Sequence, residues 1–220
     1  VDSIELVGAL SGALKNLKAK SGINIKFVSA NISGQDIVTK HSRAIIPLAE
    51  NGNKVITPSD VRKAIEQARI LGSSLQEEII HQIPFSYAID SKSNLANPLG
   101  LYSHRLEIDL YLVCAKLSAV QSLTHAINQA GYEIKNLFLS GLAEAEVIFN
   151  HKEIKNGTLI LCDIGRDTTE LLIFRDGMFK GIEVLSTGGD NLTERLSSEL
   201  KLPLDLAEDV KRSYGMAGDY

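Results

Sequence analysis

The chain has 220 residues, a formal net charge of −4 and a pI of about 5.8. Its 44% hydrophobic and 23% charged residues are typical of a globular protein large enough to form its own cores. Because the chain is acidic and its basic residues are scattered, it lacks the positive surface of a nucleic-acid-binding protein, and we expect no nucleic-acid partner. No window reaches the roughly 18 consecutive apolar residues of a membrane-spanning helix.

Residues 1–5 form neither a signal peptide nor a natural start, and we interpret them as the first turn of a helix in a cytoplasmic fragment. Cys114 and Cys162 each lie in an apolar run. This predicts buried core thiols, although a disulfide between them also remains open. The five histidines are far apart in the sequence and match no motif, so we assign them no metal or catalytic role.

The spacing of apolar residues predicts a mixed α and β chain, because spacings of three and four indicate helices and alternation indicates strands. In chain order, the predicted elements are a helix over residues 3–20, strands over 23–30 and 42–48, a helix over 57–72, strands over 78–89 and 105–115, a helix over 117–130, strands over 134–139, 158–163, 170–174 and 179–185, and helices over 190–200 and 204–214. Thr57 is the expected N-cap of the second helix, and Pro58 suits its first position. Pro84 interrupts its strand, which predicts an edge strand or a bulge there.

The order strand–helix–strand–strand–helix–strand over about residues 33–140 predicts a small two-layer α+β unit. The strand over 105–115 is the most regular, because its apolar residues alternate strictly with polar ones. The last third differs in character. It has short strands joined by tight turns, and the Asp-Gly pair within residues 175–178 is typical of a β-hairpin.

The turn over residues 163–169 is the most informative segment for chemistry. Gly165 lets the backbone approach a ligand closely, and successive backbone N–H groups in such a turn form an anion-binding nest. Thr168 and Thr169 add hydroxyl groups, and Asp163 is placed to hold Mg²⁺ through water. The turn therefore suits a polyphosphate, but the same residue types also occur in a plain β-hairpin turn.

Two later motifs add to this interpretation. Gly188 and Gly189 precede a helix, where backbone N–H groups favour anions, although a plain loop with Asn191 or Asp190 as N-cap explains them equally well. Glu208 and Lys211 lie three residues apart on one helix face, a spacing that by itself indicates a surface ion pair.

The ordered set of strand, DxGxxTT turn, strand, hairpin, strand, Gly-Gly, helix and AExxK resembles the second half of the actin-type ATPase fold. That resemblance implies that the turn binds the β- and γ-phosphates, that the Gly-Gly loop lies beside them, and that the AExxK motif contacts the adenosine. The implied nucleotide-binding residues are Asp163, Gly165, Thr168, Thr169, Gly188, Gly189, Glu208 and Lys211. Asp163 is also expected to hold magnesium through water.

One branch of that superfamily fits the whole chain. Residues 83–90 and 97–101 resemble the IPxxYxID…NPxGL signature of FtsA, the bacterial cell-division protein, and residues 138–143 resemble its following strand-to-helix segment. The resemblance implies an actin-like, ribonuclease-H-like ATPase fold with a small two-layer inserted α+β domain, and so a combined α/β and α+β class. The implied domains are a helix–strand part of an actin-like subdomain (1–32), the inserted FtsA-type or SHS2 domain (33–142), and an actin-like subdomain with the second phosphate loop (143–220).

The resemblance also implies a function. It implies an ATP-binding assembly factor of the divisome that uses ATP and Mg²⁺ and hydrolyses ATP slowly at most. Such a protein self-associates through the inserted domain. It also links the tubulin-like division ring to the inner face of the membrane as a peripheral protein. The family's first phosphate loop, late adenine motif, partner-docking surface and membrane helix fall outside residues 1–220. We therefore expect this fragment to hold no nucleotide by itself and to have no independent catalysis.

Two positions depart from the family pattern. The turn reads Asp-Ile-Gly-Arg-Asp-Thr-Thr, so Arg166 and Asp167 replace the second and third glycines of the usual Asp-x-Gly-Gly-Gly-Thr. Asp167 adds a negative charge beside an anionic ligand, a cost of about 4 kcal/mol at ~4 Å and an effective dielectric constant near 20, unless Arg166 points inward and offsets it. We predict weakened or altered nucleotide handling.

Two alternatives remain open at this stage. One is an actin-like PilM relative from pilus assembly, which has a similar inserted domain. The other is a sugar-kinase-type ATP-dependent enzyme, for which the sequence offers neither a recognisable catalytic carboxylate nor a sugar pocket.

Overall fold

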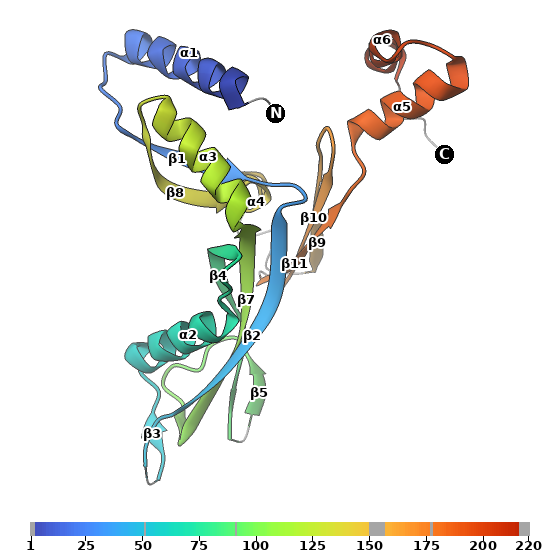
Figure 1. The fold of residues 1–220 in the computed structure, drawn as a ribbon. Helices are drawn as coiled ribbons and strands as arrows, with labels where there is room; N and C mark the ends of the chain where they lie inside the picture. The colour runs from blue at the N-terminus through green and yellow to red at the C-terminus, as the bar shows by residue number, and fades with distance from the viewer. Residues whose placement is uncertain (1–2, 51, 91, 150–156, 177, 216–220) are drawn as a thin grey trace.

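The computed structural model describes residues 3–50, 52–90, 92–149, 157–176 and 178–215 (Figure 1). The helices of this described part are α1 (Ser3–Ser21), α2 (Pro58–Gly72), α3 (Leu117–Gln129), α4 (Ser140–Ile148), α5 (Gly189–Leu200) and α6 (Leu204–Tyr214). Its strands are β1 (Phe27–Ile32), β2 (Ile37–Pro47), β3 (Lys54–Val55), β4 (Glu77–Ile89), β5 (Lys92–Leu95), β6 (Tyr102–Ser103), β7 (Arg105–Lys116), β8 (Glu133–Leu139), β9 (Thr158–Ile164), β10 (Thr169–Arg175) and β11 (Met178–Leu185). No helix among these is long and apolar enough to cross a membrane.

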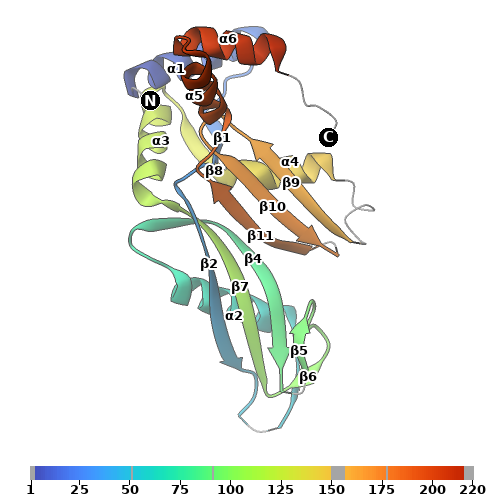
Figure 2. The ribbon, with the colours of Figure 1, turned by 90° about the vertical axis from the view of Figure 1, so that its right-hand side faces the viewer.

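The largest sheet is antiparallel, with strand order β2-β7-β4-β5, and it forms the lower lobe in Figures 1 and 2. Helix α2 packs on one face of this sheet. The alternation in the first part of β7 explains why: Leu106, Ile108, Leu110 and Leu112 are at most 2% exposed and belong to the same core as α2. The strand β7 is therefore the centre of this lobe.

The start of α2 matches the sequence prediction. Thr57 accepts a hydrogen bond from the Asp60 backbone N–H, and the Asp60 carboxylate accepts one from the Thr57 backbone N–H, so the two residues form a capping box. Lys54 lies 3.0 Å from the same carboxylate. The hydrogen bond from the Thr57 hydroxyl is the main cause that lowers the Asp60 pKa to about 2.

The residues within 83–101 that resemble the family signature have structural roles in this lobe. The β4–β7 register shifts between Pro84 and Ser86, which confirms the predicted bulge. Asp90 accepts hydrogen bonds from the Ser103 hydroxyl and the His104 backbone N–H, and so ties the end of β4 to the connection between β6 and β7. Gly100 adopts φ +80°, a conformation that favours glycine, and its N–H donates to the Ile56 carbonyl.

Two smaller sheets lie above this lobe. Strands β1 and β8 pair in parallel, and α1 and α3 lie beside them (Figure 1). Strands β9, β10 and β11 form an antiparallel meander in the order β11-β10-β9, with α4 packed against it and α5 and α6 following it (Figure 2). The short pair β3-β6 completes the tip of the lower lobe.

Strand pairing differs from the sequence interpretation in one respect. Residues 117–142 were expected within the inserted domain, but β8 pairs with β1 across about a hundred residues and not with the four-stranded sheet. The inserted unit, as strand pairing defines it, consists of the elements from β2 to β7. The domain limits stay a proposal, and we propose an end near Lys116.

Three local predictions were wrong. The strand predicted over 42–48 begins at Ile37. The first strand begins at Phe27 and not at residue 23, because pairing with β8 begins only at Phe27 and Ile23 stays exposed. Both cysteines were expected in the core, but only Cys114 is buried. Cys162 is exposed because it lies on the face of β9 that nothing in the described residues covers, and both thiols are free. Two other sequence calls, Gly177 in the hairpin turn and His151, lie outside the described residues.

Candidate functional site

The turn between β9 and β10 has the geometry of a backbone nest. Strand pairing closes at Ile164 opposite Thr169, and inside the turn the Gly165 N–H donates to the Thr168 carbonyl at 2.8 Å. Among the described residues, the backbone N–H groups of 166, 167 and 168 have no protein acceptor. Three successive N–H groups without an acceptor at a turn tip form a concavity that suits an anion.

The Gly188-Gly189 pair has a different role from the one expected. Its N–H groups are already used: Gly189 donates to the Gly165 carbonyl at 2.9 Å, and Gly188 donates to the Asn191 side chain at 2.8 Å. A Cβ on Gly188 would lie only 2.4 Å from the Arg166 carbonyl oxygen. The glycines therefore let the N-terminus of α5 pack directly onto the turn, and the N-cap is Gly188, not Asn191 or Asp190.

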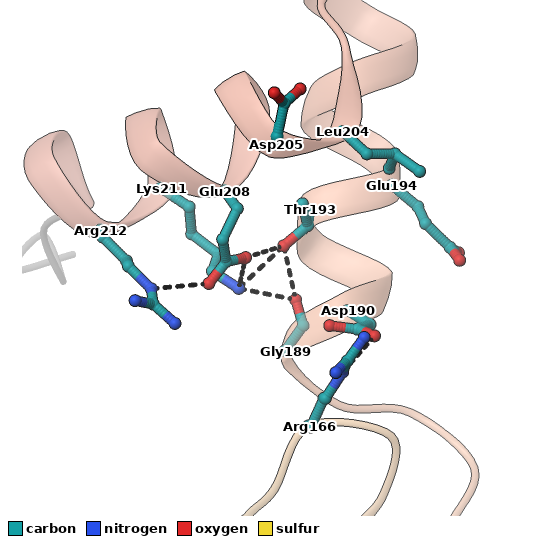
Figure 3. Close-up of a pocket in the computed structure, with 10 residues that line it drawn as sticks. All are labelled: Arg166, Gly189, Asp190, Thr193, Glu194, Leu204, Asp205, Glu208, Lys211 and Arg212. Carbon is teal, nitrogen blue, oxygen red and sulfur yellow. Dashed lines mark hydrogen bonds and ion pairs between the residues drawn. The ribbon is translucent and has the colours of Figure 1, made fainter. Parts of the chain in front are cut away.

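Glu208 and Lys211 belong to a partly buried polar cluster that joins α6 to α5 (Figure 3). Lys211 Nζ lies 2.6 Å from Glu208 Oε2, 2.8 Å from Thr193 Oγ1 and 3.0 Å from the Gly189 carbonyl oxygen. The hydrogen bond from Lys211, followed by that from Thr193, lowers the Glu208 pKa to about 2. The pair is thus more than a surface ion pair, because it fixes α6 over the start of α5.

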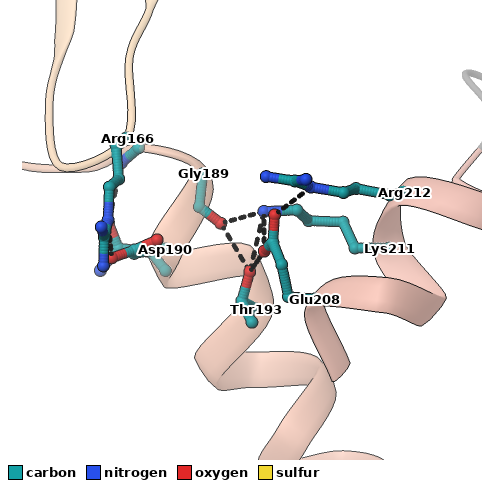
Figure 4. Close-up of polar contacts among 9 residues, drawn as sticks. Arg166, Gly189, Asp190, Thr193, Glu208, Lys211 and Arg212 are labelled. Atoms are coloured by element: carbon teal, nitrogen blue, oxygen red, sulfur yellow. Dashed lines mark hydrogen bonds and ion pairs between the residues drawn. The ribbon is translucent and has the colours of Figure 1, made fainter. Parts of the chain in front are cut away.

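Arg166 points away from the interior of the turn. Its Nε donates to Asp190 Oδ2 at 2.7 Å, and its side chain is 80% exposed (Figure 4). The guanidinium is therefore already paired with a carboxylate, and in this arrangement Arg166 does not point inward to offset Asp167, which is itself exposed.

Two hollows meet at the Arg166–Asp190 pair, because both residues line both of them. The larger, of about 850 Å³, lies between the β9–β10 turn and the segment 33–36 that leads from β1 into β2. The smaller, of about 460 Å³, lies between α5 and α6 and contains the Glu208–Lys211 cluster at its wall (Figure 3). We call the larger hollow the turn cleft and the smaller one the helix pocket.

The structure brings together all eight predicted site residues around these two hollows. Asp163, Gly165 and Thr168 line the turn cleft, and Gly189, Glu208 and Lys211 line the helix pocket. The other two lie between them: the Thr169 hydroxyl donates to the Thr187 carbonyl at 2.7 Å, and Gly188 packs on the turn.

Sequence reasoning missed Glu170, which directly follows the turn. The residue is 2% exposed, its Oε1 accepts a hydrogen bond from the Gly34 N–H at 2.7 Å, and its Oε2 is buried with no partner among the described residues. Burial is the main cause that raises the Glu170 pKa, and the nearby carboxylates of Asp163 and Glu144 raise it further. An acidic residue inside an otherwise apolar strand was the signal that could have found it.

The residues around the turn cleft fit a polyphosphate with a divalent cation. Asp163 and Glu170 lie directly opposite each other on neighbouring strands, where two like charges are unfavourable without a counter-charge. Oε2 of Glu170 is buried and has no hydrogen-bond donor among the described residues, so it would gain from a cation or a donor bound in the cleft. Carboxylate oxygens are the ligands that Mg²⁺ prefers, directly or through water.

Comparison with known proteins agrees with this geometry. The family model "SHS2 domain inserted in FTSA" matches residues 34–114, and the model "Cell division protein FtsA" matches residues 160–219. The chain belongs to the FtsA family. The first match covers the four-stranded sheet with α2, and the second covers the β9–β10 turn, α5 and α6.

Curated FtsA proteins align over nearly the whole chain. "Cell division protein FtsA" of Borreliella burgdorferi is 26% identical over 209 residues, which is 95% of this chain and 50% of that protein. The protein of the same name from Bacillus subtilis is 26% identical over 217 residues, 99% of this chain and 49% of that protein. The chain therefore spans about half the length of these relatives.

Among solved structures, a chain of the PilM–PilN type IV pilus biogenesis complex superposes with a TM-score of 0.62 at 20% identity, covering 94% of this chain and 56% of that one. At this identity the likeness concerns the fold alone. The fold is that of the actin-like ATPases with an inserted α+β domain, as the sequence predicted.

Proposed function

We propose that this FtsA-family chain supplies one wall of an ATP–Mg²⁺ site in an actin-like cell-division assembly factor. The observation that carries the proposal is the turn cleft. It combines three N–H groups of residues 166–168 without a protein acceptor, the Thr168 side chain, and the opposed Asp163 and Glu170 carboxylates. Actin-like ATPases as a class bind nucleotides, and this combination is chemically suited to phosphates and a cation.

Each residue has a distinct proposed role. The N–H groups of residues 166–168 bind phosphate oxygens, the Thr168 hydroxyl donates to one of them, and Asp163 holds the cation through water. Gly165, Gly188 and Gly189 act sterically, because they allow the turn and α5 to approach each other. Thr169 fixes the turn to the segment before α5 through the Thr187 carbonyl. Glu208 and Lys211 shape the helix pocket that receives the adenosine.

The role of the complete protein follows from the family as a proposal. We propose that its ATP site controls assembly with slow hydrolysis at most, and that the inserted domain contributes to self-association. We further propose that the protein links a tubulin-like division ring and other divisome proteins to the inner face of the membrane as a peripheral protein. The family matches carry the cell-division description, whereas the pilus protein shares only the fold.

Nucleotide titration of the complete gene product tests the proposal. We expect saturable, Mg²⁺-dependent ATP binding by isothermal titration calorimetry. Replacement of Thr168→Val should weaken it roughly ten- to hundredfold, because a hydrogen bond to a charged group contributes about 1.5–3 kcal/mol. Thr39→Val, a change of the same chemistry on β2, is the matched control and should leave the affinity unchanged. Absence of saturable binding, or equal affinity of the Thr168→Val and wild-type proteins, contradicts the proposal.

A second experiment separates division from pilus assembly. Pull-down with the complete gene product should retain the tubulin-like division protein. Retention of pilus inner-membrane proteins instead would contradict the divisome role while leaving the nucleotide site intact.

A further inference from the structure

One wall of the turn cleft is formed by the segment through which the chain enters the inserted domain. Residues 33–36, which connect β1 to β2, line the cleft opposite the phosphate-binding turn. The segment also touches the point where the chain leaves that domain. The Lys116 backbone N–H donates to the Asp36 carbonyl at 2.9 Å, and Lys116 Nζ lies 3.0 Å from the Asp36 carboxylate. A ligand in the cleft would therefore lie against the entry segment, which is itself bonded to the exit of the domain at Lys116.

Glu170 joins this segment to the turn. It belongs to β10, directly after the turn, yet its Oε1 accepts the Gly34 N–H at 2.7 Å from a residue 136 positions away. Gly34 adopts φ +87°, and a Cβ there would lie 3.7 Å from Thr168 Oγ1, so the segment lies close to the turn. The other carboxylate oxygen, Oε2, is buried without a partner among the described residues and lies on the same side of the sheet as Asp163.

The inserted domain has a second contact with the same meander, and this one is independent of charge in the cleft. The Ile182 N–H on β11 donates to the Tyr111 hydroxyl at 3.3 Å, and the Tyr111 and Phe179 rings meet edge to face with centroids 5.4 Å apart. Lys180 Nζ lies 4.8 Å from the centre of the Phe85 ring. This mostly aromatic contact is suited to act as a fixed pivot, whereas the Glu170–Gly34 bond is the one that faces the cleft.

We infer that Glu170 is a positioning residue that transmits occupancy of the turn cleft to the inserted domain. The inference rests on the proposed nucleotide site. A divalent cation with its phosphates relieves the repulsion between the opposed Asp163 and Glu170 carboxylates and gives the free oxygen a partner. The carboxylate is then held in place, the Gly34 N–H bond is formed more of the time, and the segment 33–36 is fixed against the turn. Without the ligand, the segment opens more often and the inserted domain is freer to move about its aromatic contact.

Hydrogen–deuterium exchange of the complete gene product, with and without saturating Mg²⁺–ATP, tests this inference. In the wild-type protein we expect the ligand to slow exchange of the amides of residues 33–37 roughly tenfold or more, as one strengthened charge-assisted hydrogen bond allows. Glu170→Ala removes the acceptor, so exchange there should be fast with and without ligand. Glu170→Gln retains an acceptor for the Gly34 N–H but no charge. Its amides should be better protected than those of Glu170→Ala, with no response to the ligand.

Two further variants keep the test decisive if loss of a buried carboxylate disturbs folding. Gly34→Ala leaves Glu170 intact but strains the segment at φ +87°, and should remove the response at residues 33–37 at a ligand concentration that saturates the variant by its own titration. Glu183→Ala on the exposed side of β11 is the matched control, and its response should equal that of the wild type. Nucleotide binding without any change at residues 33–37, or a full response in Glu170→Ala, overturns the inference alone. Absence of nucleotide binding overturns the proposed function and this inference with it.

Discussion

Replacement of Gly188 by alanine should separate α5 from the β9–β10 turn. The added Cβ would lie 2.4 Å from the Arg166 carbonyl oxygen and 2.7 Å from the Gly165 carbonyl oxygen. Both are backbone atoms that no rotamer change can move, so the helix must withdraw by about 1 Å to reach an ordinary van der Waals distance. Gly188 itself has φ −150°, which alanine adopts freely, so the expected effect is steric and not conformational.

The magnitude follows from the contacts that this withdrawal breaks. The hydrogen bonds from Gly189 N–H to the Gly165 carbonyl and from Asp190 N–H to the Arg166 carbonyl, each 2.9 Å long, would be stretched beyond bonding distance. Two such bonds contribute about 1 kcal/mol each, and overpacking adds roughly 1–2 kcal/mol. We therefore expect Gly188→Ala to lower the free energy of local unfolding of α5 by about 3–4 kcal/mol.

The neighbouring glycine is the matched control. A Cβ on Gly189 would meet Lys211 Nζ at 3.5 Å and the Gly165 carbonyl oxygen at 3.7 Å, which are ordinary contacts. Because alanine is also the better helix former, Gly189→Ala should change stability by less than about 1 kcal/mol. Hydrogen exchange of the α5 amides measures local opening without requiring two-state unfolding of the whole protein. Equal protection of α5 in Gly188→Ala and the wild type, or equal loss in both variants, would refute the steric reasoning.

Three further predictions concern charge. Arg166→Ala should change the free energy of unfolding by less than about 1 kcal/mol, measured by thermal denaturation, because its ion pair with Asp190 is largely exposed. Asp167→Asn should strengthen Mg²⁺–ATP binding several-fold at low salt and less at high salt, whereas Asp209→Asn on α6 should not; a salt-independent gain would contradict an electrostatic cause. Asp60 has a lowered pKa, so its contribution to stability is complete above its ordinary value of 3.8 and is lost as the pH falls toward about 2. Asp60→Asn should therefore destabilise the inserted sheet at pH 7 by urea unfolding, and the difference from the wild type should shrink between pH 4 and 2.

Local signals in the sequence were sufficient for much of the fold. The capping residues at Thr57 placed the start of α2 correctly, because a cap depends on residues within one helical turn. The alternation in β7 identified its buried face, and the polar turn between two apolar runs located β9 and β10. Each of these patterns depends on neighbours in the sequence.

Features that depend on distant contacts could not be predicted in the same way. The parallel pairing of β1 with β8 joins residues about a hundred positions apart, and the sequence assigned β8 to the inserted unit instead. The role of the Gly188-Gly189 pair depends on which carbonyl groups face α5, and these belong to the turn over 163–169. The expectation of free N–H groups at the glycine pair was therefore wrong, while the same glycines still belong to the candidate site.

The position of Glu170 in the candidate site also depends on distant contacts, so it could not be predicted from the sequence. In the sequence Glu170 is an acidic residue beside an apolar run, a signal that singles the residue out but does not show that its side chain is buried. Its burial and its bond to Gly34 result from packing of the β1–β2 connection against the turn. The eight site residues predicted from the motif gather around two adjoining hollows, but the carboxylate with an unsatisfied oxygen was not among them.

A structure of the complete gene product with Mg²⁺ and a non-hydrolysable ATP analogue tests the central claim most directly. The account predicts the β- and γ-phosphates in the turn cleft, bound by the N–H groups of residues 166–168, with the cation on the side of Asp163 and Glu170. Phosphates bound elsewhere, with those N–H groups left free, would contradict it.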